Sequence, residues 1–136
     1  MNEVRKKQIA ILGSTGSIGT QALDVISEHP NLFEVYALTA NNRVDELIQQ
    51  ARKFLPDVVV IANESKYSYL KESLQDLPIK VYAGADALTQ IVTAHPIDIV
   101  LTAMVGYAGL KPTIEAIKAK KIIALANKET LVVAGE

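Results

Sequence analysis

The stretch Ile9-Ala-Ile-Leu-Gly-Ser-Thr-Gly-Ser-Ile-Gly19 decides the fold, because it joins a short apolar run directly to a glycine-rich turn. The run from Gln8 to Leu12 is rich in isoleucine, which is typical of a strand buried on both faces of a sheet. Beyond the turn, apolar residues recur at helical spacing as far as His29-Pro30, where a helix must stop. A dinucleotide-binding fingerprint is meaningful only in this order of strand, glycine turn and helix.

The turn contains three glycines, Gly13, Gly16 and Gly19, with two residues between each pair. In dinucleotide-binding turns the first glycine permits a sharp reversal of the chain, and the second lets the backbone approach a pyrophosphate. The third glycine allows the helix to pack closely on the strand. The spacing GxxGxxG differs from the commoner GxGxxG, so a purely structural turn before a helix stays open as an alternative.

The start of the following helix supplies the chemistry that a phosphate group needs. Its first N–H groups are unpaired and carry a partial positive charge. We expect the hydroxyl groups of Ser14, Thr15 and Ser17 to add hydrogen-bond donors. A phosphate-binding P-loop is excluded, because no Gly-Lys-Ser/Thr follows the glycines.

The end of the second expected strand, Phe33 to Thr39, is where a ribose-binding residue belongs, about 20 residues past the glycine turn. An NAD-specific site places an acid there, but this chain has Asn41, Asn42 and Arg43 and no acid before Asp45, inside the next expected helix. A cation and neutral donors suit a 2′-phosphate, so the sequence favours NADP over NAD. The alternative is that Arg43 merely begins a helix in solvent.

The rest of the chain alternates apolar runs with amphipathic segments. Further strands are expected at Asp57–Ala62, Ile79–Ala83, Ile97–Thr102 and Ile122–Ala126. Further helices are expected at Val44–Phe54, Glu64–Leu74, Ala85–Ala94 and Leu110–Lys120. This alternation predicts an α/β fold, Rossmann-like and doubly wound, with a mainly parallel sheet and helices on both faces. We expect one domain over residues 1–136 with no interior boundary.

Composition narrows the function classes. A net charge of -1 gives no electrostatic case for binding nucleic acid or an anionic membrane. Cysteine is absent, which excludes disulfides and thiolate metal sites in this sequence. No apolar run has the length of a membrane span, and the polar start Met1–Lys7 does not fit a signal peptide, so we expect a cytoplasmic protein. His29 and His95 each precede a proline at an expected helix end and are interpreted as structural.

Two later loops follow expected strands and should lie at the ligand-binding edge of the sheet. The apolar loop Ala103–Gly109 should pass near the nicotinamide end of a cofactor, with a packed turn as the alternative. In the segment Asn127–Thr130, Lys128 could clamp an anionic substrate and Glu129 could accept a hydrogen bond from a ribose. The alternative is that Asn127 caps a new helix with Glu129 in its first turn.

Three stretches together carry a family resemblance: Gly13–Leu23, Ala103–Thr113 and Ala124–Val132. They resemble the 1-deoxy-D-xylulose 5-phosphate reductoisomerase family in register over essentially the whole chain. The glycine turn is shared with many dehydrogenases, whereas the Ala-Asn-Lys-Glu segment ending at Glu129 is specific.

The resemblance implies an enzyme of non-mevalonate isoprenoid biosynthesis. It rearranges 1-deoxy-D-xylulose 5-phosphate and reduces the product with NADPH to 2-C-methyl-D-erythritol 4-phosphate, aided by a divalent Mg, Mn or Co ion. By matched position, Lys128 would contact the sugar-phosphate substrate. The implied cofactor-binding residues are Gly13, Thr15, Gly16, Ser17, Ile18, Asn41, Asn42, Arg43, Ala103, Met104, Val105, Asn127 and Glu129.

Two points qualify what this chain can do by itself. Many relatives have a glycine, a basic residue and Asn at the second-strand end, where this chain has Asn41-Asn42-Arg43. The catalytic residues, the carboxylate metal ligands and the C-terminal domain of the family are expected beyond Glu136, so the chain is expected to be an N-terminal NADPH-binding fragment. The full-length protein is expected to be a homodimer, whereas the fragment alone is expected to be inactive.

Two other functions stay open on the sequence. One is a regulatory module that senses a dinucleotide without chemistry, although the pair Lys128-Glu129 has little use in such a module. The other is a different NADP oxidoreductase with a GxTGxxG start, such as a semialdehyde dehydrogenase, against which the Ala-Asn-Lys-Glu segment argues.

Overall fold

The computed structural model describes residues 6–102, 119, 122–126 and 131–134 of the chain. Within them, one seven-stranded sheet has the strand order β4-β3-β2-β1-β5-β6-β7. The strands are β1 (Lys7–Leu12), β2 (Phe33–Ala40), β3 (Val58–Ile61), β4 (Lys80–Ala83), β5 (Ile99–Thr102), β6 (Ile122–Ala126) and β7 (Leu131–Ala134). All neighbouring pairs are parallel except β6 and β7, which are antiparallel.

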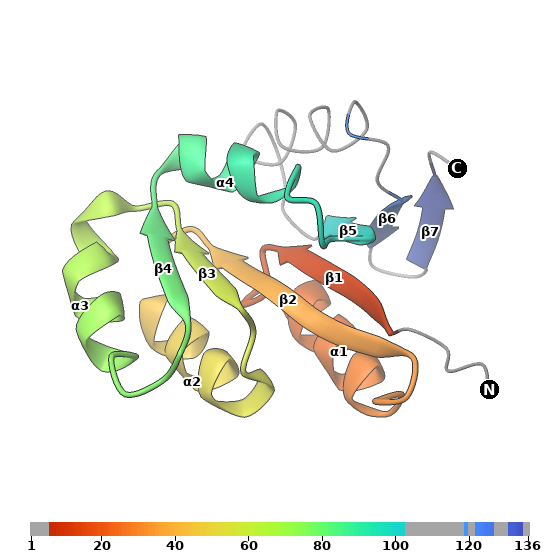
Figure 1. Cartoon of the computed structure of the whole chain (residues 1–136), viewed down its shortest axis with the longest axis horizontal. Helices are drawn as coiled ribbons and strands as arrows, with labels where there is room; N and C mark the ends of the chain where they lie inside the picture. The colour runs from red at the N-terminus through yellow and green to blue at the C-terminus, as the bar shows by residue number, and fades with distance from the viewer. Residues whose placement is uncertain (1–5, 103–118, 120–121, 127–130, 135–136) are drawn as a thin grey trace.

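Helices cover both faces of this sheet (Figure 1). They are α1 (Ser17–Ser27), α2 (Val44–Phe54), the 3-10 turn η1 (Glu64–Lys66), α3 (Tyr67–Ser73) and α4 (Ala85–Ile91). Helices α1, α2 and α3 bury their apolar residues in one cluster against the sheet, whereas α4 packs into a second cluster on the opposite face. The expected Rossmann-like, doubly wound and mainly parallel fold is confirmed.

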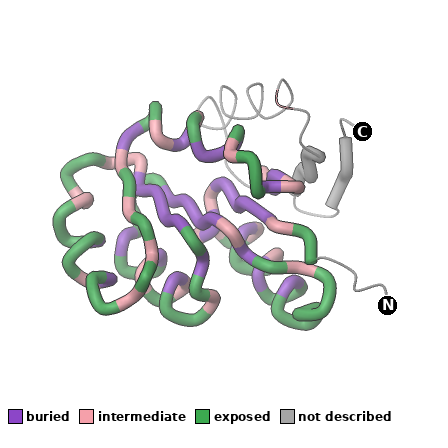
Figure 2. The backbone as a smooth tube through the Cα atoms, viewed as in Figure 1, coloured by how far each residue is buried: buried purple, intermediate pink, exposed green. Residues whose placement is uncertain are grey.

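The central strands supply side chains to both clusters, because successive residues of a strand point to opposite faces. In β1, Ile9 and Ile11 belong to the cluster beneath α1 and α2, and Ala10 and Leu12 belong to the cluster beneath α4. Strand β3 is buried along its whole length in the same alternating way. The buried backbone therefore follows the middle of the sheet (Figure 2).

Strand β2 carries an irregularity that the sequence did not reveal. Its pairing with β1 shifts between Ile9 and Ala10, so that Tyr36 has no partner residue on β1. Tyr36 and Ala37, although adjacent, both pack with the α4-side cluster. A bulge of this kind re-aims the residues that follow it. It thereby sets which side chains of β2 reach the carboxyl edge of the sheet.

Several expected boundaries are confirmed and others are corrected. The helix Val44–Phe54 and the strand Ile122–Ala126 have the expected bounds. The expected helix Glu64–Leu74 begins instead as the 3-10 turn η1, where the Asn63 side chain accepts a hydrogen bond from the Ser65 N–H at 3.0 Å. The expected helix Leu110–Lys120 lies outside the described residues, apart from Ala119.

The expectation of a new helix opened by Asn127 is wrong over residues 131–134. These residues form the strand β7, which pairs with β6 in antiparallel register, with Ala126 opposite Leu131. The segment Leu131-Val-Val-Ala134 contains two β-branched residues, which favour a strand. Among the described residues, no helix has both the length and the apolar content needed to cross a membrane.

The close packing at Gly19 gives a first test of the fold. A Cβ added at Gly19 would lie 2.7 Å from the Ser14 Cα and closer still to the Gly13 carbonyl oxygen, both of them backbone atoms. We expect Gly19→Ala to lower the free energy of unfolding by roughly 3 kcal/mol, at the upper end of overpacking costs.

The matched control is Gly16→Ala, because the nearest atom to an added Cβ there is 3.8 Å away. Its backbone is extended, so alanine fits, and we expect a change below about 1 kcal/mol. Urea unfolding followed by circular dichroism measures both. Equal stabilities of the two variants would contradict this packing.

Candidate functional site

The candidate site lies at the carboxyl edge of the parallel strands. Strands β1, β2, β5 and β6 are parallel and adjacent, so their carboxyl ends share one edge. The chain builds outward from β1 through β2 and β3 to β4, and then crosses back to place β5 on the other side of β1. Such a reversal opens a crevice between the two central strands, where ligands of this fold class bind.

The glycine turn is fastened to the end of β2 by two backbone donors. The N–H of Gly13 donates to the Thr39 Oγ1 at 3.1 Å, and the N–H of Ser14 donates to the Thr39 carbonyl oxygen at 2.9 Å. Gly13 has a φ of +84°, which an L side chain rarely adopts. The sharp reversal expected of the first glycine is therefore present. Thr39 is fully buried, so its hydroxyl satisfies a backbone group that a larger apolar residue would leave unpaired.

The hydroxyl of Ser14 faces the interior, contrary to its expected role as a phosphate donor. Ser14 is fully buried, and its Oγ lies 2.7 Å from Oε1 of Gln50 and 3.2 Å from the Thr39 carbonyl oxygen. The Gln50 side-chain amide donates to the Ser14 carbonyl oxygen at 2.8 Å. Because every polar group of Ser14 has an internal partner, this residue supports the turn and leaves ligand contacts to its neighbours.

The remaining part of the turn is open toward the helix start. Gly16 is the N-cap of α1 with an extended backbone, and the space beside it would admit a Cβ, so neither conformation nor internal packing requires glycine there. The helix has no side-chain cap and no acidic residue in its first turn. Its first N–H groups lack helical partners. This arrangement suits an anionic group placed close against Gly16, Ser17 and Ile18.

Asn41, Asn42 and Arg43 are exposed beside this turn, between the end of β2 and the start of α2. The side chain of Asn42 accepts a hydrogen bond from the Asn63 amide at 2.8 Å, which ties this segment to the end of β3. Arg43 lies 3.9 Å from Glu46, and both side chains are at least half exposed. An ion pair this exposed to solvent is weak, so the guanidinium group of Arg43 is available to another anion.

The acid nearest to this segment in sequence is directed elsewhere. The Asp45 carboxylate accepts a hydrogen bond from the Tyr69 hydroxyl of α3 at 2.8 Å. That hydrogen bond, and secondarily the charge of Asp45, raise the pKa of Tyr69 above its ordinary value. Asp45 therefore links α2 to α3, which agrees with the sequence argument that it is not the ribose-binding acid.

The other predicted residues lie outside the described part of the chain. These are Ala103, Met104, Val105, Asn127, Lys128 and Glu129. The strands that precede them, β5 and β6, end at Thr102 and Ala126 on the same edge as the glycine turn. Among the described residues, no three His, Asp or Glu side chains gather in a way that could hold a metal ion.

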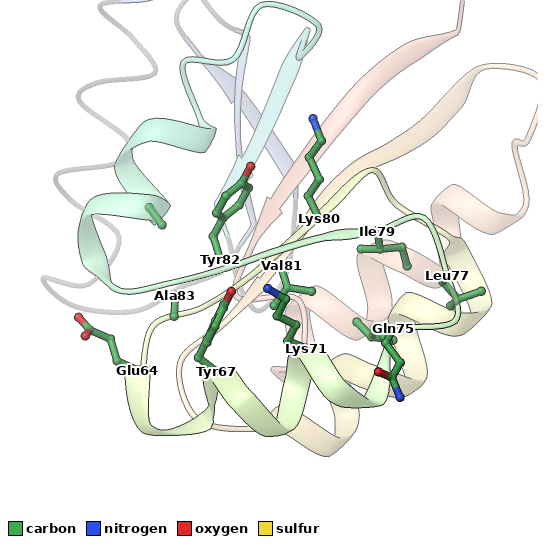
Figure 3. Close-up of a pocket in the computed structure, with 12 residues that line it drawn as sticks. Glu64, Tyr67, Lys71, Gln75, Leu77, Ile79, Lys80, Val81, Tyr82 and Ala83 are labelled. Atoms are coloured by element: carbon green, nitrogen blue, oxygen red, sulfur yellow. The ribbon is translucent and has the colours of Figure 1, made fainter.

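A hollow in the described residues lies away from this site. It is an open groove between α3 and the edge strand β4, lined among others by Tyr67, Lys71, Lys80 and Tyr82 (Figure 3). Strand β4 is separated from β1 by β3 and β2, and no residue of the glycine turn lines the groove. A phosphate site made of backbone donors at a helix start needs no deep pocket, so the groove and the candidate site are separate features.

The sequence does not predict that Thr39 and Gln50 support the glycine turn. From the sequence, Thr39 is expected only as the last residue of a strand, and Gln50 only as part of a helix. Their contacts with Gly13 and Ser14 span 26 and 36 positions in the chain, so no local pattern reveals them. A threonine at the end of an expected apolar strand is the one signal that the sequence offers for Thr39.

A doubly wound, mainly parallel sheet, with an uncapped helix start behind the glycine turn at its switch point, defines a Rossmann-like domain with a candidate phosphate-binding site. The sequence profile of the 1-deoxy-D-xylulose 5-phosphate reductoisomerase family matches residues 9–135. The chain belongs to this family.

The similarity to individual relatives is high. The chain is 79% identical to the 1-deoxy-D-xylulose 5-phosphate reductoisomerase of Bacteroides fragilis, over all of this chain and 35% of that protein. It is 68% identical over 96% of its length to the same enzyme of Porphyromonas gingivalis, covering 34% of that protein. The chain thus spans about a third of the length of the curated relatives it matches.

Solved structures agree with the fold. The reductoisomerase of Zymomonas mobilis in complex with NADPH superposes with a TM-score of 0.85 at 41% identity, over 92% of this chain and 33% of that one. A DOX-P reductoisomerase in complex with NADPH, fosmidomycin and magnesium gives a TM-score of 0.85 at 39% identity, over 90% and 30% of the two chains.

The anchoring of the turn by Thr39 is testable. Thr39→Val keeps the shape of the side chain but leaves the Gly13 N–H without its acceptor. We expect a loss of about 1–3 kcal/mol in the free energy of unfolding, the cost of an unsatisfied buried donor. The control is Thr93→Val, since the hydroxyl of Thr93 bonds the Gln90 carbonyl oxygen at an exposed site. Equal losses in urea unfolding would contradict the anchoring role.

The contact between α2 and α3 predicts a titration change. Asp45→Asn removes the negative charge beside the Tyr69 hydroxyl and should move the pKa of Tyr69 down toward its ordinary value. Because the pKa is raised in the folded state, the contact stabilises the fold at neutral pH and is lost as the pH rises through that pKa. Tyrosine NMR signals followed against pH measure this. Glu46→Gln is the control, and an equal change in it would disprove the assignment.

Proposed function

We propose that this chain is the NADPH-binding part of a 1-deoxy-D-xylulose 5-phosphate reductoisomerase. The observation that carries the proposal is the open, uncapped start of α1 behind a glycine turn at the switch point of the sheet. The family match and the NADPH complexes of related proteins support the choice of cofactor. As a domain, we propose that residues 1–136 form one unit dedicated to this cofactor.

The diphosphate of the cofactor would lie against the start of α1. Thr15, Gly16, Ser17 and Ile18 lie at the start of α1, where the helix charge favours an anion. The Gly16 N–H donates to the Gly13 carbonyl oxygen at 3.4 Å, so the donors for the diphosphate would come from the first turn of the helix. The space beside Gly16, where an added Cβ would meet only the Gly13 carbonyl oxygen at an ordinary contact distance of 3.8 Å, is the space a diphosphate needs. The residues therefore fit the group. Their work is to bind and orient it; Gly13 shapes the turn that brings them there.

The 2′-phosphate would lie against Asn41, Asn42 and Arg43. Arg43 is two-thirds exposed and weakly paired, so its guanidinium group can turn to a phosphate at little cost. Asp45, the acid that would repel a phosphate there, is held by Tyr69. This combination favours NADPH over NADH.

The whole protein's activity is part of the same proposal. NADPH supplies the hydride that reduces the rearranged substrate to 2-C-methyl-D-erythritol 4-phosphate. Within this chain, Ala103, Met104 and Val105 would lie along the nicotinamide end, Asn127 and Glu129 would complete the cofactor site, and Lys128 would hold the anionic sugar phosphate. The divalent metal would take carboxylates from the rest of the protein, which we propose is a cytoplasmic homodimer.

The family match over residues 9–135 disfavours the semialdehyde dehydrogenase alternative. A regulatory module that only senses a dinucleotide has no need of Lys128, whereas in the proposed enzyme Lys128 holds the substrate. In the full-length protein, Lys128→Ala should lower turnover while leaving NADPH affinity unchanged.

Calorimetric titration of this chain with NADPH and, separately, with NADH tests the cofactor assignment. We expect NADPH to bind more tightly, and Arg43→Ala to remove about 1.5–3 kcal/mol of that preference, the value of one charge-assisted contact. Lys53→Ala, at the other end of α2, is the control for a general charge effect. Equal binding of the two cofactors would contradict the 2′-phosphate site, and binding of neither would contradict the proposal.

The isolated chain gives a second test. We expect it to bind NADPH without converting 1-deoxy-D-xylulose 5-phosphate, because the metal-binding carboxylates belong to the remainder of the proposed enzyme. Absorbance at the NADPH band, with Mg²⁺ or Mn²⁺ added, measures turnover. Robust metal-dependent turnover by this chain would refute the proposal that the metal-binding residues lie in the rest of the enzyme.

A further inference from the structure

Gln50 makes a reciprocal contact that no cofactor-binding pattern includes. Its side-chain amide donates to the Ser14 carbonyl oxygen at 2.8 Å, and its Oε1 accepts from the Ser14 hydroxyl at 2.7 Å. A carbonyl oxygen can only accept a hydrogen bond, so the Gln50 NH₂ group must face the Ser14 carbonyl oxygen and Oε1 must face the Ser14 hydroxyl. The hydroxyl has one proton, and the shorter distance assigns it to Gln50 rather than to the Thr39 carbonyl oxygen at 3.2 Å.

The contact joins two segments that would hold two different phosphate groups of one ligand. Ser14 lies in the turn that precedes α1, whereas Gln50 lies in α2, the helix that begins directly after Arg43. An 11-residue helix is a rigid element, so fixing Gln50 also fixes the start of α2. The N–H of Ser14 is bound separately to Thr39 of β2. The turn is thus held by the strand at one point and by α2 at another.

We propose that Gln50 is a positioning residue that sets the spacing between the diphosphate-binding turn and the 2′-phosphate-binding start of α2. The inference rests on the proposed function. A ligand that touches both segments at once gains affinity when their separation is fixed before it binds. NADPH would touch both segments. NADH lacks the 2′-phosphate and so gains less from their fixed spacing.

This difference separates a positioning role from a merely structural one. A general loss of stability leaves affinity unchanged while nearly all molecules stay folded, and it cannot distinguish NADPH from NADH. Loss of the Gln50 contacts should instead weaken NADPH binding more than NADH binding. When Arg43 is absent, the extra loss for NADPH should shrink, because the only cation of the proposed 2′-phosphate segment is gone.

The experiment titrates the chain, and the full-length protein, with NADPH and NADH and follows cofactor fluorescence. We expect Gln50→Leu to raise the Kd for NADPH on the order of tenfold, the scale of one or two hydrogen bonds, and the Kd for NADH by a smaller factor. In an Arg43→Ala background the difference between the two factors should become smaller. The matched control is Gln49→Leu, an exposed neighbour on the same helix, which should leave both constants unchanged.

The outcomes distinguish this inference from the proposed function. If the unaltered protein binds NADPH and Gln50→Leu leaves its Kd unchanged, or raises both constants equally, the positioning role is overturned and the proposed function stands. If the unaltered protein binds no NADPH, both are overturned. Should Gln50→Leu fail to fold, Gln50→Met keeps an unbranched side chain of similar length and removes both hydrogen bonds to Ser14 without adding a charge. That variant should show the same preference for weakening NADPH.

Discussion

The fold depends on how the chain leaves β1. It must turn from a strand buried on both faces into a helix within a few residues, and every backbone polar group in that turn needs a partner or a ligand. Thr39 takes the N–H groups of Gly13 and Ser14, and Gln50 takes the carbonyl oxygen of Ser14. What these contacts leave over is the row of N–H groups at the start of α1. The hydrogen bonds that stabilise the turn therefore leave the start of α1 available to an anion.

The arrangement around this turn follows from the sheet order. Because β2 and β5 flank β1 in parallel orientation, the carboxyl ends of all three strands lie at the edge of the sheet where the turn begins. On the β2 side this brings Arg43 near the proposed diphosphate site, while the Tyr69 hydroxyl holds the carboxylate of Asp45. On the β5 side the next strand is β6, after which the family's Asn-Lys-Glu segment occurs. One backbone constraint and one strand order thus account for the part of the proposed site that lies in the described residues.

The sequence predicted most strands and helices because apolar periodicity and glycine spacing are local signals. Apolar runs and glycine spacing gave the strands near Gly13, and the helix Val44–Phe54 was correct at both ends. The failures concern contacts between distant segments. The inward-facing Ser14 hydroxyl depends on Gln50, 36 positions away, and β7 depends on pairing with β6. Neither leaves a periodic trace, and Asn127 before Leu131 offered a plausible helix start that the sheet overrode.

The most direct test of the central claim is hydrogen exchange of backbone amides with and without NADPH. The account predicts that NADPH slows exchange at Thr15–Ile18 and at Asn41–Arg43, where its phosphates would cover N–H groups. Exchange along the groove between α3 and β4 should stay unchanged. Protection confined to that groove, with the glycine turn exchanging as before, would contradict the assignment of the site.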